Sequence, residues 1–362
     1  MTAWKVGLVG ILAWMLVCAS DPENAIAQKP DSADQADPAK EPVAPPQLQQ
    51  AYGLCKAAKT IEDYTMIIDL CREGLAAEPE GSFVGYGKRL GAWAYNRRGE
   101  LYAKAKEPND EAALADFEAA VAGDPKKWRH LHNRSVSYAM AGESEKALAD
   151  VNRLIEMRPD FAKAHYNRGE LRFQLGKLDE AIRDYTQAIR LAPRDAAAFS
   201  SRGFAYHQQQ NWRAALSDYN RAIALDRNNA EAHVNRGNWN IDRSRLTEGI
   251  RDFEQAIRID PEYGPAYVSA AWFRATCPQP RYRDAASALR SANKAIALDG
   301  EGPRYLDALA AAYAAGGDFE KAVATQKKTI EADPENREYA GRLKLYEGGK
   351  AYIDSINGNR DE

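Results

Sequence analysis

Arginine and aspartate recur in two rows through the middle of the chain, at a spacing that would let them form repeated ion pairs. The arginines are Arg98, Arg134, Arg168, Arg202 and Arg236. The aspartates are Asp116, Asp150, Asp184, Asp218 and Asp252. Both rows stop together toward each end of the chain, so we expect each arginine to pair with the aspartate that follows it. A partly buried, bidentate pair would fix register more than it adds net stability. The alternative is an exposed charged track that binds a ligand.

A third row carries side-chain amides, which could hold a peptide. Asn133, Asn167 and Asn235 each stand one residue before one of these arginines, and Ser201 interrupts the row. An amide offers both donors and an acceptor, so a row of amides can bind the backbone of an extended peptide. Further residues that we expect to line such a binding site are His132, Tyr166, Glu170, Phe173, Phe204, His207 and Trp272.

The residues that catalysis or metal binding would require show no recognisable pattern. The five histidines lack metal-ligand spacing, and no phosphate-binding loop, nucleophile elbow or kinase signature is present. Lysine and arginine are interleaved with aspartate and glutamate, and the net charge is −3, so no basic stripe would attract nucleic acid. We therefore predict no enzyme activity, no catalytic residue, no metal and no cofactor. The expected partner is a protein or peptide, not nucleic acid or a small-molecule substrate.

The elements that must position these rows are paired helices, because four further rows recur at 34 residues. Small residues on a first helix are Gly169, Gly203 and Gly237. Small residues on a second helix are Ala147, Ala181 and Ala215. Aromatic residues four positions later are Tyr185, Tyr219 and Phe253. Prolines that would end each pair are Pro125, Pro159, Pro193 and Pro261. The small residues let two helices approach, the aromatic residue fills the space beside them, and the proline stops the second helix.

This pattern resembles the tetratricopeptide repeat family. Its landmarks are matched by Gly169, Ala181, Tyr185 and Pro193 within YNRGELRFQLGKLDEAIRDYTQAIRLAP. The resemblance implies an all-α, right-handed superhelical solenoid that serves as a protein-interaction scaffold, with the asparagine row in its concave groove. That row resembles the asparagine ladder of the tetratricopeptide region of O-linked N-acetylglucosamine transferase. The alternative is that asparagine is simply common at this place in the family.

The repeats divide most of the chain. We predict a repeat array over 48–334 with eight helix pairs, a capping helix and tail over 335–362, and a flexible, proline-rich linker over 28–47. The predicted pairs cover 48–79, 92–125, 126–159, 160–193, 194–227, 228–261, 265–302 and 303–334. Residues 82–91 fall between the first two pairs and are expected to lengthen the helix that follows.

Cysteine use leaves one choice open in the first repeat. Cys55 and Cys71 fall at two landmarks that face each other across one helix pair. An oxidising compartment would allow a disulfide between them, which the sequence slightly favours. The alternative is two buried thiols that act as small apolar residues.

The first 27 residues have the features of an export signal. Lys5 precedes an uncharged apolar run over 6–19, and Ala25-Ile26-Ala27 offers small residues for cleavage after Ala27. The alternatives are a retained anchor, for which the run is short, and a lipoprotein signal that uses Cys18. Membrane association would then come only through an uncleaved or lipidated N-terminus.

Together these features predict a non-enzymatic scaffold of the periplasm or cell envelope. It would bind an extended peptide or a partner protein in the concave groove. Two alternatives remain, a membrane-anchored assembly factor for envelope proteins and a self-associating structural component.

Overall fold

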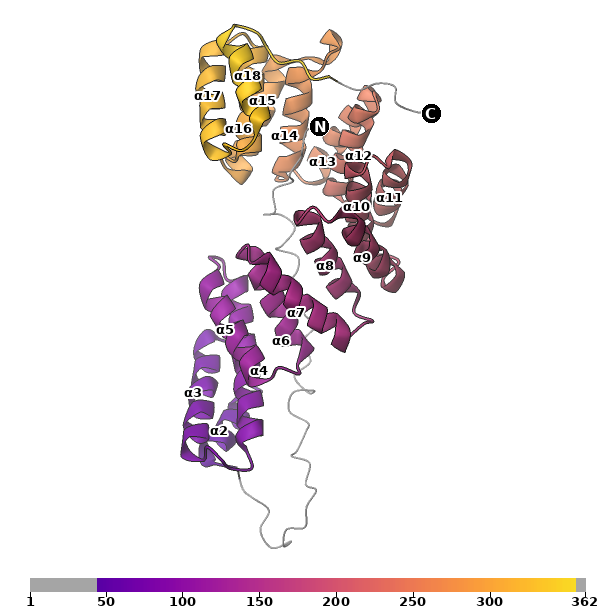
Figure 1. The fold of residues 1–362 in the computed structure, drawn as a ribbon. Helices are drawn as coiled ribbons and strands as arrows, with labels where there is room; N and C mark the ends of the chain where they lie inside the picture. Colours follow the sequence, from indigo (N-terminus) through magenta and orange to yellow (C-terminus); the bar gives the residue numbers. More distant parts are fainter. Residues whose placement is uncertain (1–43, 356–362) are drawn as a thin grey trace, which may run out of the picture. The chain divides into compact units, whose positions relative to one another are not determined.

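A computed structural model describes residues 44–355, which form an all-α fold without strands. The predicted signal peptide, Cys18 and the linker up to residue 43 lie outside the described residues, as do residues 356–362. The all-α stack of helix pairs predicted from the sequence is confirmed (Figure 1). Within residues 44–355, no helix has both the length and the apolar character needed to cross a membrane.

The described chain divides into two compact units, with the boundary in the sequence between Leu175 and Gly176. Unit 1 contains α2 (Pro46–Leu54), α3 (Ile61–Ala77), α4 (Val84–Lys104), α5 (Asp110–Gly123), α6 (Trp128–Met140), α7 (Ser144–Met157) and α8 (Ala162–Gln174). Its helices pack in sequential pairs, α2 with α3, α4 with α5, and α6 with α7. The excess predicted at 82–91 lengthens α4 at its start, as expected.

Unit 2 continues the pattern. It contains α9 (Leu178–Leu191), α10 (Ala196–Gln208), α11 (Trp212–Leu225), α12 (Ala230–Asp242), α13 (Leu246–Ile259), α14 (Gly264–Thr276), the short 3-10 helix η2 (Pro280–Tyr282), α15 (Ala285–Asp299), α16 (Pro303–Ala315), α17 (Phe319–Ala332) and α18 (Arg337–Glu347). The helices α10 to α17 form four sequential pairs, and their first helices α10, α12, α14 and α16 contact one another in turn. The predicted lone helix after 334 is α18, which packs against α17.

The helices begin and turn where local chemistry requires it. Thr60 and Asp63 form a reciprocal capping box at the start of α3, and Asp195 accepts two backbone N–H bonds at the start of α10. The tight turns within successive hairpins place one residue at positive φ, at Gly142, Gly176, Gln210 and Ser244. Glycine adopts this conformation without steric cost, whereas Gln210 and Ser244 adopt it against their side chains.

The row of glycines exists because an aromatic ring occupies the space that a side chain would need. A Cβ atom on Gly99 would lie 2.8 Å from the Phe117 ring, and one on Gly237 would lie 2.6 Å from the Phe253 ring. Both rings are almost fully buried. The hairpin of α6 and α7 has the opposite combination, with Ser135 on the first helix and Val151 on the second.

That exchange leaves a small cavity inside unit 1. Its volume is about 10 Å³, and its lining residues include Ser135, Val151 and Asn167. A valine cannot fill the volume that phenylalanine fills in the preceding hairpin, while the serine side chain prevents a larger ring from entering. The two residues should therefore be coupled in their effect on stability.

We predict that Val151→Phe alone destabilises the protein, because Ser135 blocks the ring. The double variant Ser135→Gly/Val151→Phe reproduces the Gly99–Phe117 pairing and should be more stable than the sum of the single changes by about 2 kcal/mol. Urea unfolding of the wild type, both single variants and the double variant measures this coupling. Additive changes would contradict the proposed packing.

Burial also makes unit 1 sensitive to acid. His130 on α6 is buried, and its Nδ1 lies 3.1 Å from the Ala120 carbonyl oxygen. Burial lowers the pKa of His130 to about 4 from its ordinary value near 6.5. Between these two values the unfolded chain binds more protons than the folded chain, so this contribution to stability is lost as the pH falls below 6.5.

We predict that the wild type loses about 2 kcal/mol more stability between pH 7 and pH 5 than the variant His130→Asn. The measurement is urea unfolding at both pH values. Equal losses in the two proteins would show that His130 does not carry this acid sensitivity.

Candidate functional site

Four of the five arginine–aspartate pairs form as bidentate ion pairs within their hairpins. In the hairpin of α10 and α11, the Arg202 Nε–H and Nη2–H groups donate to the two Asp218 carboxylate oxygens at 2.7 and 2.9 Å. The equivalent contacts at the other three pairs measure 2.7 to 3.0 Å, and they join Arg98 with Asp116, Arg134 with Asp150, and Arg236 with Asp252. All four carboxylates are buried. These four pairs therefore connect the helices of one hairpin, as predicted, and do not form an exposed charged surface that would bind a ligand.

Arg168 and Asp184 belong to different units. Arg168 lies on α8 and donates to the Asn152 side chain on α7 at 2.9 Å, whereas Asp184 is buried on α9. Their pairing stays a prediction.

Three of the paired arginines also reach the hairpin before their own, a contact that the sequence did not predict. Arg202 Nη1–H donates to the Thr186 hydroxyl on α9 at 3.0 Å, and Arg236 Nη1–H donates to the Asn220 amide oxygen on α11 at 2.9 Å. Arg98 makes the equivalent bond to Thr65. The guanidinium therefore joins two hairpins as well as the two helices of one. The signal was present, since Asn152, Thr186 and Asn220 stand 34 residues apart.

Two of the three asparagines are buried between first helices. Asn133 donates to the Asn96 amide oxygen at 3.0 Å and to Glu100 at 3.2 Å, and Asn235 donates to the Ser200 hydroxyl at 3.2 Å. Asn133 is 1% exposed and Asn235 is 6% exposed. Contact with a peptide backbone, the role predicted for them, is not available to them in this structure. They instead bind the first helix of the preceding hairpin.

Asn167 differs from the other two amides. It is buried, and neither its amide nitrogen nor its amide oxygen has a hydrogen-bond partner within the described residues. It lines the small cavity of unit 1 together with Glu170. A cavity of about 10 Å³ is at the lower limit for one water molecule and cannot admit a peptide backbone.

The remaining residues predicted for the groove divide by exposure. His132, Glu170 and His207 are buried, and His207 Nε2 lies 2.9 Å from the Asp242 carboxylate on α12. They are therefore placed inside the stack and not on a face open to a ligand. Partly exposed side chains are those of Tyr166, Phe173, Phe204 and Trp272.

Trp272, on α14, contacts an extended stretch of the chain itself. Its indole N–H donates to the Asp354 carboxylate at 3.0 Å, and the Tyr352 ring lies 5.7 Å from its own ring, centroid to centroid. The backbone N–H of Asp354 donates to the Thr276 carbonyl at 2.8 Å. Unit 2 thus holds a piece of extended polypeptide at one of the predicted groove residues.

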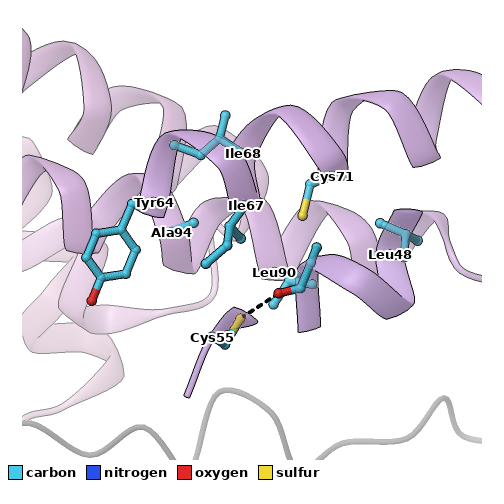
Figure 2. Packing of buried hydrophobic residues seen from close by; sticks show 9 residues of the cluster. Leu48, Cys55, Tyr64, Ile67, Ile68, Cys71, Leu90 and Ala94 are labelled. Carbon is cyan, nitrogen blue, oxygen red and sulfur yellow. Dashed lines mark hydrogen bonds between the residues drawn. The ribbon is translucent and has the colours of Figure 1, made fainter. Parts of the chain in front are cut away.

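The predicted disulfide is not formed in this structure, where Cys55 and Cys71 are buried free thiols. The Cys55 thiol donates instead to the Ala51 carbonyl at 3.3 Å, which is the dashed line in Figure 2. Both sulfurs lie among Leu48, Ile67 and other apolar side chains of the first core cluster (Figure 2). Burial raises the pKa of Cys55 to about 11 and that of Cys71 to about 12. They serve as small apolar residues, the alternative that the sequence left open.

The described residues hold no group of three or more histidine, cysteine, aspartate or glutamate side chains that could bind a metal ion. The ion pairs, the buried amides and the buried thiols all connect helices to one another. The surface that remains for recognition is the Trp272 region and the other partly exposed aromatic side chains.

Family models for tetratricopeptide repeats match residues 111–160, 169–240 and 303–336. No curated protein sequence matches the chain. Solved structures that share the fold include two with TM-scores above 0.5. The Cut9 and Hcn1 hetero-tetramer of the APC/C gives a TM-score of 0.59 at 15% identity over 83% of this chain, which spans only 55% of that chain. Yeast Tom70 gives 0.53 at 16% identity over 93% of this chain and 69% of that chain.

We predict that Asp218→Ala destabilises the protein by about 3 kcal/mol, because it leaves the partly buried Arg202 guanidinium without its carboxylate. The matched control is Asp160→Ala, which breaks the solvent-exposed pair with Arg158 and should leave the melting temperature unchanged within error. Thermal unfolding followed by circular dichroism measures both. Equal melting temperatures for the two variants would contradict a structural role of the buried pair.

Proposed function

Because the chain carries tetratricopeptide repeats, a fold that generally mediates protein–protein interaction, we propose that it is a non-enzymatic scaffold that binds an extended segment of a partner protein. The observation that carries this proposal is the extended segment held at Trp272 in unit 2. There α14 offers an indole N–H and the carbonyl at its C-terminal end, which bind a side chain and a backbone N–H of the segment together.

Two further features support binding as opposed to catalysis. The polar side chains that the sequence placed in a groove are largely bonded to other helices, so they form no convergent set of acid, base and nucleophile. Scaffolds of this repeat type are generally without activity. Aromatic side chains that are partly exposed offer a large contact area to a partner, and Phe204 and Trp272 have this character.

We further propose that the scaffold works in the periplasm or cell envelope. The support is the sequence of residues 1–27, with its positive start, apolar run and small residues at 25–27. Removal of this segment after Ala27 would leave Gln28 as the first residue. The proline-rich linker would then form the N-terminal part of the exported protein, ahead of the repeat array.

The site of partner contact can be tested by photo-crosslinking in the cell that encodes the protein. We predict that benzoylphenylalanine in place of Phe204 crosslinks to a partner protein, because an aromatic residue at that position conserves the local shape. The same residue in place of exposed Arg190 on α9 is the matched control and should not crosslink. Equal yields at the two positions, or no product at either, would contradict the proposal.

In the same cells, mass spectrometry of the N-terminus should find Gln28, whereas an acylated Cys18 would favour the anchored alternative.

A further inference from the structure

The C-terminal strap, defined as residues 350–355, leaves the last helix and returns to α14. Its direction is set just after α18, where Gly349 has a φ of +66° and Lys350 N–H donates to the Leu345 carbonyl at 2.9 Å. The strap is not helical. It lies against helices of unit 2 that are far from it in sequence, so its position depends on side-chain and backbone recognition.

One residue of the strap is recognised twice. The carboxylate of Asp354 accepts the Trp272 indole N–H at 3.0 Å, while its backbone N–H donates to the Thr276 carbonyl at 2.8 Å. Thr276 is the last residue of α14, where carbonyl groups have no partner inside the helix. The receiving helix therefore presents one donor and one acceptor, and a single acidic residue in an extended chain satisfies both.

Tyr352, a second residue of the strap, packs against a platform that is built by helices of unit 2. The Arg342 guanidinium carbon lies 5.2 Å from the Trp272 ring, 5.3 Å from the Tyr339 ring and 5.3 Å from the Tyr352 ring. Arg342 is itself fixed by the buried Asp307, with 2.9 Å between Nε and Oδ1. Helices α14, α16 and α18 supply every part of this platform except Tyr352. An aromatic side chain from another chain could take the place of that one ring.

Ile353 lies between Tyr352 and Asp354 in the sequence, and its side chain points away from the site. Ile353 is 42% exposed, which is unusual for a large apolar side chain in this protein. Alternate residues of an extended chain face opposite sides, so Tyr352 and Asp354 contact the helices while Ile353 faces solvent. The recognised pattern is therefore an aromatic residue, any residue, and an aspartate.

We propose that the strap is an internal ligand. It occupies a site that binds an extended segment of a partner protein carrying the same aromatic–x–Asp pattern, and strap and partner compete for this site. This inference rests on the proposed function, because it assigns the chemistry of the partner segment that the scaffold would hold. The site comprises Trp272, the Thr276 carbonyl, Arg342 and Tyr339.

The tether determines how strongly the strap competes. A short flexible connection gives a local concentration of about 1 mM. If the free segment binds with a Kd of about 100 μM, the strap occupies the site about 10 times more often than it leaves it, and a partner binds about 10-fold more weakly to the closed site. Partner segments with more contacts than the strap would overcome this factor.

The test uses the full chain and a fluorescently labelled peptide of residues 349–355, Gly-Lys-Ala-Tyr-Ile-Asp-Ser. Fluorescence anisotropy should show that the strap variant Tyr352→Ala/Asp354→Ala binds the peptide about 10-fold more tightly than the wild type does. The matched control Ile353→Ala changes a strap residue that faces solvent, and it should bind as weakly as the wild type. Adding Trp272→Phe to the strap variant keeps a ring but removes the indole N–H, and it should weaken peptide binding again.

Equal peptide affinity of the wild type and a folded strap variant would overturn the proposal, as would no binding by either. If the double variant does not fold, Asp354→Ala alone keeps the Tyr352 ring and allows the same comparison. On the wild-type chain, excess peptide should accelerate hydrogen exchange at the Asp354 amide, and an unchanged rate would count against competition. If the peptide fails while crosslinking from position 204 succeeds, the internal-ligand inference is wrong and the proposed scaffold function stands.

Discussion

A stack of helix hairpins has no central core, so each hairpin must be stabilised by contacts with its immediate neighbours. Three guanidinium groups of the first helices make two kinds of contact at once. Arg202 binds Asp218 through two of its donors and Thr186 of the preceding second helix through a third. A lysine has the charge but not the planar arrangement of donors that these directions require. At the junctions bridged by Arg98, Arg202 and Arg236, the position of a hairpin relative to the one before it thus depends on one planar side chain.

The polar network explains why so few groove residues remain for recognition. Asn133 and Asn235 lie between neighbouring first helices, where an unpaired amide would be costly, and each donates to the helix before it. His207 similarly joins α10 to α12 through Asp242. A repeat that recurs at a fixed spacing places the same residue at the same interface in every copy, so a repeated polar row is as well suited to holding the stack together as to holding a ligand.

The helices, their pairing and the close contact of glycine with an aromatic ring could be predicted from the sequence, because each leaves a row at 34 residues. The pairing of Arg202 with Asp218 could be predicted for the same reason. The burial of Asn133 could not, since spacing places a side chain on a helix face but does not show how closely the next helix approaches. The free thiols of Cys55 and Cys71 likewise depend on side-chain directions that spacing does not specify. The strap at Tyr352 and Asp354 has no repeat to signal it, and its partner Trp272 lies some 80 residues earlier in the sequence.

The bonds from Arg98, Arg202 and Arg236 to the hairpin before each of them have a consequence for how such a chain can change in length during evolution. Duplication of the copy formed by α10 and α11 would bring along Arg202, Asp218 and the Asn220 acceptor for the next arginine, so the new junction would have the same partners. Loss of that copy would likewise leave a polar acceptor, Thr186 on α9, before the next arginine. The end of unit 2 has no such freedom, because Arg342, Asp307 and the strap bind residues of three different helices that occur once. The middle of the array can therefore grow or shrink by gene rearrangement, while its last helices must be inherited as one piece.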